Sequence, residues 1–213
     1  GRIVVRCEAA AGMAVRVEWG SSVKLDQFAD ARETPVFDVA PRGFGTAMYE
    51  AVLTGIEPGR RYVYRFSVQG EDGPLFPFRA PPRDGTRTPF RFVVTSDSQH
   101  HPEVHRRIVE RGMLALVDGA RPEDSLAFVL MAGDLVDLGH VRDQWQDLVF
   151  DPLRELAGRI PLYCALGNHE DDANFFFCYL GLPRRYAYTY ANCRFVTLDT
   201  NTGQRTAEQL AWL

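Results

Sequence analysis

The second half of the fold is decided by three short stretches, Thr95-Ser96-Asp97-Ser98-Gln99, Gly133-Asp134-Leu135-Val136-Asp137-Leu138-Gly139 and Gly167-Asn168-His169-Glu170. Each follows an apolar run that predicts a buried β-strand, at residues 90–94, 126–132 and 160–166. The lead residues Asp97, Asp134 and Asn168 are 37 and 34 residues apart. One strand, one returning helix and the next strand need about 30 residues or more. We therefore expect the three stretches to meet at the carboxyl edge of one parallel sheet.

Oxygen donors gathered at such an edge, together with one imidazole, suit a pair of hard divalent cations. Asp134 is the candidate bridging carboxylate, because two cations about 3.5–4 Å apart need a negative group between them. Asn168 would bind through its side-chain oxygen. The plainer interpretations also stand: Asp97 and Asp134 as helix caps or turn residues, and Asn168 as a turn residue after Gly167.

In order, these stretches resemble the first three motifs of the calcineurin-like metallophosphoesterases: Asp-x-His, Gly-Asp-x-x-Asp-x-Gly and Gly-Asn-His-Glu. The resemblance covers about residues 90–213 and implies Asp97, Gln99, Asp134 and Asn168 as metal ligands. Gln99 stands where the family usually has His, and an amide oxygen is a weaker donor than imidazole. The neighbouring His100 and His101 are alternatives that would need a shifted strand end.

The resemblance implies that His169 is catalytic, as an acid or transition-state stabiliser near the leaving oxygen. Asp134 acts with it through the metals. Glu170 is expected to orient its neighbours by hydrogen bonds and not to bind metal. Asp137 stands where purple acid phosphatases carry a Tyr ligand, which speaks against the coloured iron–tyrosinate subtype. It either caps a turn or takes a direct role.

Other side chains near the motifs have plainer explanations. We expect the remaining histidines to be solvated, with His140 also placed to line the pocket; they are His100, His101, His105 and His140. The aromatic run Phe175-Phe176-Phe177 with Tyr179 is either packing or a wall for the group esterified to phosphate, and we favour packing.

Two later His motifs of the family are missing, and the sequence ends within a helix predicted from Thr206. We interpret the chain as the first part of a longer protein with an incomplete site, which should by itself bind metal poorly. Apolar residues predict helices along Ile108, Gly112, Ala115 and Leu116, and along Trp145, Leu148, Val149, Leu153 and Leu156. Pro152 should kink or divide the second. Tyr186–Tyr190 and Cys193–Leu198 read as a hairpin.

The first part of the chain alternates apolar and polar residues, for example at Val15, Val17 and Trp19, which is typical of half-buried strands. The segment from Leu53 to Tyr62 resembles the tyrosine corner of fibronectin type III domains, with the Tyr62 hydroxyl bonded back to the chain near Ile56. This part resembles the N-terminal domain of purple acid phosphatases and related phosphodiesterases.

The predicted fold is an all-β, fibronectin III-like sandwich at residues 1–82, a linker at 83–89 and an α/β metallophosphatase domain at 90–213. The second domain would be of the four-layer α/β/β/α type, truncated. The four cysteines lack zinc-site spacing, Cys164 should be buried, and a Cys178–Cys193 disulfide is open.

The composition is that of a globular protein with a net charge of −4 and a pI near 5.8. These values argue against a nucleic-acid surface built on bulk positive charge. No apolar run approaches the roughly 18 residues of a membrane helix, and no signal-peptide pattern opens the sequence. The residues do not indicate an oligomeric state; a secreted or periplasmic location rests on the resemblance alone.

The expected function is hydrolysis of phosphate mono- or diesters by a hydroxide that two metal ions activate. By resemblance the ions are divalent or trivalent Fe, Zn or Mn. One rival is a nucleotidase or phosphodiesterase acting on nucleotides. The other is a non-catalytic binding or scaffold protein with a vestigial metal site, which Gln99 and the missing motifs favour.

Overall fold

The computed structural model describes residues 2–34, 45–117, 121–170, 174–201, 203 and 206–213. The chain divides into two compact units, Gly1–Arg83 and Asp84–Leu213. The division falls at the start of the stretch 83–89 that the sequence predicts as a linker. In residues 84–92 no helix or strand is present, as Pro89 and the small polar residues before it would lead one to expect.

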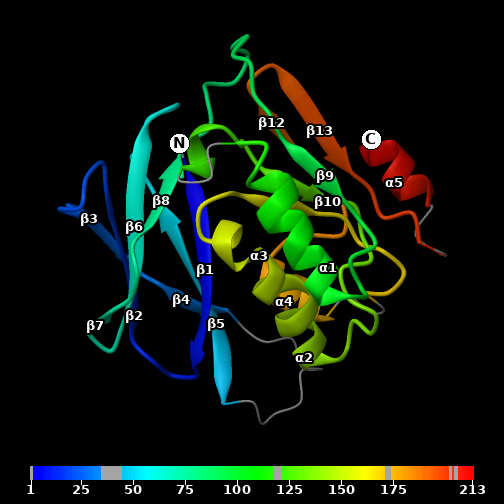
Figure 1. Cartoon of the computed structure of the whole chain (residues 1–213), viewed down its shortest axis with the longest axis horizontal. Helices are drawn as coiled ribbons and strands as arrows, with labels where there is room; N and C mark the ends of the chain where they lie inside the picture. Colours follow the sequence, from blue (N-terminus) through cyan, green and yellow to red (C-terminus); the bar gives the residue numbers. More distant parts are fainter. Residues whose placement is uncertain (1, 35–44, 118–120, 171–173, 202, 204–205) are drawn as a thin grey trace. The chain divides into compact units, whose positions relative to one another are not determined.

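Two antiparallel sheets make up the described part of the first unit (Figure 1). One has the strand order β1–β5–β4, and the other has the order β3–β2–β6–β7 with β8 also paired to β6. The strands are β1 Ile3–Ala10, β2 Val15–Gly20, β3 Gln27–Asp30, β4 Arg32–Thr34, β5 Thr46–Leu53, β6 Arg61–Val68, β7 Glu71–Asp72 and β8 Phe76–Arg79. The longest ladder joins β1 to β5 over eight residue pairs.

The core of the first unit is contributed by both sheets. Val5 and Leu53 come from one sheet, and Trp19, Tyr64 and Phe78 come from the other. All five are buried, because alternate residues of a strand face the same side of its sheet. The period-two prediction is therefore confirmed for the described strands of this unit, which form two antiparallel sheets with a shared apolar core.

The expected corner contact is also present. The backbone N–H of Glu57, next to Ile56, donates a hydrogen bond of 3.0 Å to the Tyr62 hydroxyl. Tyr62 is buried and stacks on Phe78 with ring centroids 5.5 Å apart. The bond ties the turn before β6 to the strand itself. The assignment of this unit to the fibronectin III type stays a prediction.

A parallel sheet of order β11–β10–β9 forms the centre of the second unit. Its strands are β9 Val93–Thr95, β10 Val129–Met131 and β11 Leu162–Cys164, each shorter than the apolar run that predicts it. Val93, Val129 and Leu162 lie side by side in register. The three strands therefore end level with one another, and the segments that follow them leave from the same edge.

Helices connect these strands and follow them (Figure 1). They are α1 Pro102–Arg107, the π-helix η1 Ile108–Met113, the 3₁₀ helix η2 Pro122–Asp124, α2 Arg142–Gln144, the π-helix η3 Trp145–Phe150, α3 Asp151–Ala157, α4 Asn174–Leu180 and α5 Ala207–Trp212. The helix changes type just before Pro152, because η3 ends at Phe150 and Pro152 lies in the first turn of α3. The backbone stays helical across this junction, so the chain does not leave the helix there, and a kink at Pro152 stays a prediction. The helix α5 begins next to Thr206 as expected, and the Thr206 side chain caps it by accepting a hydrogen bond from the Gln209 N–H.

The apolar stripe predicted for the helix after Pro102 is wrong by one position. The buried residues are His105, Val109 and Met113, whereas Ile108 is 47% and Leu116 is 74% exposed. The buried residues recur every fourth position, and this face continues from α1 into the π-helix that begins at Ile108. His105, expected to be solvated, is only 3% exposed and is a second correction. The stripe predicted around Trp145 is confirmed by the burial of Trp145, Val149, Leu153 and Leu156.

The predicted hairpin is confirmed as β12 Tyr186–Tyr190 and β13 Cys193–Thr197. Its aromatic side chains pack on the parallel sheet: Tyr188 stacks on Tyr163 with centroids 3.7 Å apart, and Phe195 lies 5.1 Å from Phe128. Helices, a parallel sheet and a hairpin give an α/β fold, as the sequence predicts for the second unit. The full four-layer arrangement stays a prediction.

The remaining sequence expectations concern side chains of the second unit. Phe175, Phe176 and Tyr179 of α4 are buried, and Tyr179 contacts Trp145 and Phe150, in agreement with packing. Cys164 is buried as expected. No disulfide is recorded among the described residues, so the open Cys178–Cys193 pairing is not formed.

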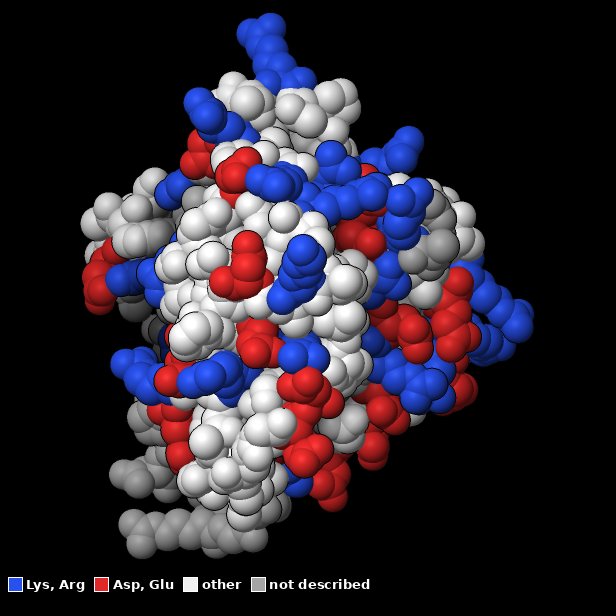
Figure 2. Space-filling model, turned by 90° about the vertical axis from the view of Figure 1, so that its left-hand side faces the viewer, with Lys and Arg blue, Asp and Glu red and all other residues white. Residues whose placement is uncertain are grey.

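The described helices include none with the length and apolar character needed to cross a membrane. On the molecular face shown in Figure 2, basic and acidic side chains are interspersed. The expected lack of a nucleic-acid surface is untested and stays a prediction.

Candidate functional site

The three predicted motifs lie at one edge of the parallel sheet. Asp97 follows β9 by two residues, Asp134 follows β10 by three, and Asn168 follows β11 by four. The first two loops are joined directly, because the Asp97 N–H donates to the Gly133 carbonyl at 3.2 Å. The backbones that carry the predicted ligands thus converge in space.

Both aspartates have an unusual backbone. Asp97 has φ of 54° and Asp134 has φ of 53°, in the left-handed region that non-glycine residues seldom adopt. Such conformations cost free energy and persist where the surroundings enforce them, often at functional sites.

The second and third motifs touch backbone to backbone. Gly133 has φ of +96°, and a Cβ there would lie 2.8 Å from the Gly167 Cα. A Cβ on Gly167 would in turn overlap the Asp134 carboxylate. Glycine at both positions is therefore required by this close approach.

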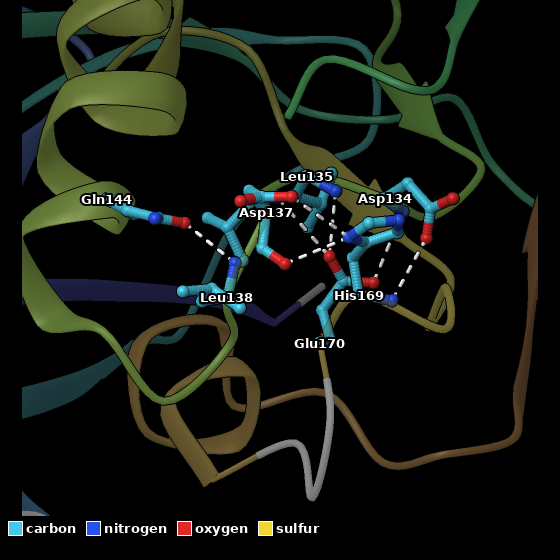
Figure 3. A network of polar contacts seen from close by, with 8 residues as sticks. Asp134, Leu135, Asp137, Leu138, Gln144, His169 and Glu170 are labelled. Carbon is cyan, nitrogen blue, oxygen red and sulfur yellow. Dashed lines mark hydrogen bonds and ion pairs between the residues drawn. The ribbon is translucent and has the colours of Figure 1, made fainter. Parts of the chain in front are cut away.

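A buried carboxylate fastens these two loops (Figure 3). Glu170 is fully buried and accepts four backbone hydrogen bonds. Its Oε1 accepts from the N–H groups of Leu135 at 2.7 Å and Val136 at 3.4 Å. Its Oε2 accepts from Asp134 at 3.2 Å and Gly167 at 2.5 Å. Burial raises the pKa of Glu170, and the four N–H donors oppose that shift.

His169 connects the motifs through two further bonds (Figure 3). Its backbone N–H donates to Asp134 Oδ1 at 3.2 Å, and its Nδ1 lies 2.9 Å from the Asp137 carbonyl oxygen. A carbonyl can only accept, so Nδ1 carries a proton and Nε2 is the nitrogen left for chemistry. The bond to the Asp137 carbonyl raises the pKa of His169, as do the nearby carboxylates of Asp134, Asp137 and Glu170.

Asp137 therefore contributes to this arrangement directly. Its carboxylate Oδ1 lies 3.4 Å from His169 Nδ1, in addition to the carbonyl contact. The sequence left open a turn cap or a direct role for Asp137, and which of the two applies stays a prediction.

A helix supports the same loop from behind. The buried indole N–H of Trp145 donates to the Gly139 carbonyl at 2.9 Å, and the Gly139 N–H donates to the His169 carbonyl at 2.9 Å. A Cβ on Gly139 would lie 2.6 Å from the Glu170 Cα, so no larger residue fits there. Gln144 accepts from the Leu138 N–H at 2.7 Å (Figure 3).

Gln99 supplies the observation that tests whether these residues suit a cation. Its Oε1 is buried and has no hydrogen-bond partner among the described residues. A buried unpaired oxygen costs about 1–3 kcal/mol, which a cation or donor at that position would recover. Its neighbours His100 and His101 are exposed, and His101 Nδ1 lies 3.4 Å from Glu103. His140 is also exposed.

Among the described residues, no three His, Cys, Asp or Glu side chains are grouped closely enough to hold a metal ion. The predicted donor set explains part of this result, since two of its four members are the amides Gln99 and Asn168. Two carboxylates and two amides remain an all-oxygen set, which fits a hard cation.

A comparison with known protein families supports the assignment of the three motifs. A model of the calcineurin-like phosphoesterase family matches residues 90–207, which contain all three. The chain belongs to the calcineurin-like phosphoesterase family. Membership implies divalent or trivalent metal ions as cofactors.

Solved structures share the fold of this calcineurin-like phosphoesterase. A purple acid phosphatase, PPD1 from yellow lupin (Lupinus luteus) seeds, is 16% identical with a TM-score of 0.71 over 98% of this chain. A structure of PhoD is 14% identical with a TM-score of 0.53 over 88% of this chain. The present chain covers 45% of each of these two chains, less than half their length. A comparison with curated proteins gave no match.

Sequence reasoning missed a group of polar residues in this phosphoesterase at the end of β13. Asp199 is 1% exposed and Gln209 is 7% exposed, and Asn201 donates to the Gly167 carbonyl. A signal was available, because Asp199 follows an apolar strand as Asp97 and Asp134 do. The role of Trp145 as a donor was also missed, since its position in an apolar stripe indicated packing alone.

Proposed function

We propose that this calcineurin-like phosphoesterase hydrolyses phosphate mono- or diesters at a dinuclear metal centre. Asp97, Gln99, Asp134 and Asn168 would hold the ions, with Fe, Zn or Mn as the candidates. The observation that carries the proposal is the convergence of three loops at one sheet edge. The backbone N–H of Asp97 donates to the Gly133 carbonyl, and the backbone N–H of His169 donates to Asp134 Oδ1.

The donors have distinct parts in this proposal. Asp134 is the bridging carboxylate: its Oδ1 already accepts from the His169 N–H, which fixes the direction of the group. Gln99 contributes the buried oxygen that lacks a partner among the described residues. Two cations bound by these oxygens would neutralise the phosphoryl oxygens and lower the pKa of an attacking water.

His169 is the proposed acid for the leaving oxygen. The Nδ1 contact with Asp137 orients the ring and leaves Nε2 to donate a proton. The raised pKa of His169 increases the fraction that carries this proton near neutral pH. Glu170 touches neither substrate nor proton in this scheme and acts by holding the Asp134 and Gly167 N–H groups.

We further propose that the first unit is a fibronectin III-like sandwich. The core shared by two antiparallel sheets and the bond between Glu57 and Tyr62 support this assignment. The substrate stays at the level of a phosphate ester, because the described residues show no feature that selects a leaving group.

The test compares the complete protein with Asp134→Asn in metal analysis and in hydrolysis of p-nitrophenyl phosphate and its bis-ester. Loss of a bridging charge should reduce turnover at least about 100-fold. Asp147→Asn, a change of the same kind at an exposed position of η3, is the matched control and should keep full activity. Unchanged turnover in Asp134→Asn would remove Asp134 from the mechanism. A wild-type protein that binds metal without hydrolysing either ester would favour the scaffold alternative.

A further inference from the structure

The turn after β13 contacts the third motif, although it lies outside all three motifs. Asn201 Nδ2 donates to the Gly167 carbonyl at 3.1 Å. Gly167 directly precedes Asn168, a proposed ligand. A residue 34 positions away in the sequence thus holds the peptide that leads into the ligand.

This turn is itself held by the side chain of Gln209 in α5. The Asp199 N–H donates to Gln209 Oε1 at 3.1 Å, and Gln209 Nε2 donates to the Asp199 carbonyl at 2.7 Å. One amide therefore pairs with both backbone groups of one residue, as a neighbouring strand would. Gln209 and Asp199 are both buried, so these bonds are shielded from water.

The Asp199 carboxylate completes the turn. Its Oδ1 accepts from the Asn201 N–H at 3.1 Å, which sets the position of Asn201. Its Oδ2 accepts from Arg184 Nη1 at 3.0 Å, which balances the charge of a nearly fully buried carboxylate.

We propose that Asn201 is a positioning residue for Asn168. Glycine has wide backbone freedom, and Gly167 loses it by bonds at both ends. Its N–H is held by Glu170 at 2.5 Å and its carbonyl by Asn201 at 3.1 Å. The direction of the following residue is then fixed before any ligand binds. The importance of this effect for metal binding rests on the proposed function, whereas the fixing of Gly167 does not.

The experiment uses two variants and one control in the complete protein. Asn201→Asp keeps the size of the side chain and replaces the donating NH₂ by an oxygen that repels the Gly167 carbonyl. Asn201→Ala removes the contact altogether. Asn192→Asp makes the same chemical change at the exposed turn of the hairpin, 22 or more residues from the motif. Thermal melting establishes folding, and Asn201→Asp carries the test if Asn201→Ala does not fold.

The first measurement is amide hydrogen exchange of a peptide spanning residues 165–170 in metal-free protein. Loss of one hydrogen bond should speed exchange there by about five- to tenfold in the Asn201 variants. The control should exchange at the wild-type rate. Unchanged exchange in both Asn201 variants, or equal acceleration in Asn192→Asp, would overturn the positioning role.

The second measurement is the Mn²⁺ dissociation constant, obtained from the electron paramagnetic resonance signal of free Mn²⁺. Residues that orient a ligand typically change metal affinity by about 10–100-fold, so both Asn201 variants should bind at least about tenfold more weakly. Wild-type affinity in both variants would overturn the inference about Asn168. A wild-type protein that binds no Mn²⁺ would count against the proposed function, and the exchange result would still decide whether Asn201 fixes Gly167.

Discussion

In the first unit, strands β1 and β5 pair over eight residues, whereas each parallel strand of the second unit spans three. The first unit is held by backbone ladders and an apolar core between two sheets. Near the candidate site of the second unit, many backbone groups bond instead to single side chains. Glu170 alone takes four N–H groups, and Gln209 takes both backbone groups of Asp199.

Because of this contrast, the two units should respond differently to the loss of a side chain. A ladder distributes its free energy over many similar bonds, so the loss of one side chain leaves the rest in place. A loop that depends on one buried polar side chain loses several bonds at once when that side chain changes. We therefore expect matched substitutions to cost much more at the site than in the sandwich.

Glu170→Gln should show the largest effect. The new NH₂ group would face N–H donors, such as those of Asp134 and Gly167, and leave them unpaired. Each unpaired buried donor costs about 1–3 kcal/mol, so the second unit should lose about 4 kcal/mol of unfolding free energy. Hydrogen exchange at increasing urea concentration, read separately for each unit, measures the loss.

The control for this change is Glu50→Gln in the first unit. Glu50 pairs with Arg6 at 3.3 Å, and both side chains are partly exposed. Such a pair contributes about 0–1 kcal/mol. Equal losses in the two variants would contradict the contrast between the units.

Trp145→Phe should have the next largest effect. Phenylalanine keeps most of the ring but loses the N–H that the buried Gly139 carbonyl accepts at 2.9 Å. The unpaired carbonyl should cost about 1–3 kcal/mol beyond the loss of ring volume. Trp19→Phe in the sandwich is the matched control, because Trp19 is also buried. Urea unfolding measures the loss of unfolding free energy in both variants. If Trp145→Phe loses no more than Trp19→Phe, the indole hydrogen bond does not stabilise the second unit.

Sequence patterns predicted the fold where burial alone decides it. The alternation at Val15, Val17 and Trp19 and the stripe through Trp145 and Leu153 correspond to buried faces. The pattern failed at Ile108, which is 47% exposed while the neighbouring Val109 is buried. Both positions carry an apolar residue, so spacing alone does not decide which of them faces the core.

At the site, the sequence predicted which loops would meet but not what holds them. Apolar runs before Asp97, Asp134 and Asn168 were enough to place all three at one edge. The contacts of Asn201 and Gln209 could not be predicted, because they join residues far apart in the sequence. Side-chain amides also follow no characteristic sequence spacing that would indicate such contacts. The burial of His105 was missed because a histidine among charged residues is usually exposed.

Tyr62→Phe measures what the loss of one polar contact costs in the first unit. The variant keeps the stacking on Phe78 and loses only the hydroxyl that accepts from the Glu57 N–H at 3.0 Å. The expected loss is about 1 kcal/mol in the first unit, with hydrolysis and metal binding unchanged. A loss above that of Trp145→Phe, measured by the same urea unfolding, would mean that the sandwich also depends on single polar contacts.

The smallest effect at neutral pH should come from His105 and should grow as the solution is acidified. Burial lowers the pKa of His105, while its Nδ1 bonds the Leu148 carbonyl at 3.0 Å. Its Nε2 is buried with no hydrogen-bond partner among the described residues, so a proton there would be poorly accommodated. Above about pH 6.5 both folded and unfolded chains hold this group neutral, and it adds no pH dependence.

Below that pH the unfolded chain binds a proton that the folded chain does not. The unfolding free energy should therefore fall as pH decreases, by no more than about 1.4 kcal/mol per pH unit for one proton, until the lowered pKa is reached. His105→Gln removes the titrating group and keeps a donor for the Leu148 carbonyl, so its stability should depend less on pH between about 6.5 and 5. His100→Gln, at an exposed position, should follow the wild-type curve. Parallel curves for His105→Gln and wild type would show that other groups control the acid sensitivity of the second unit.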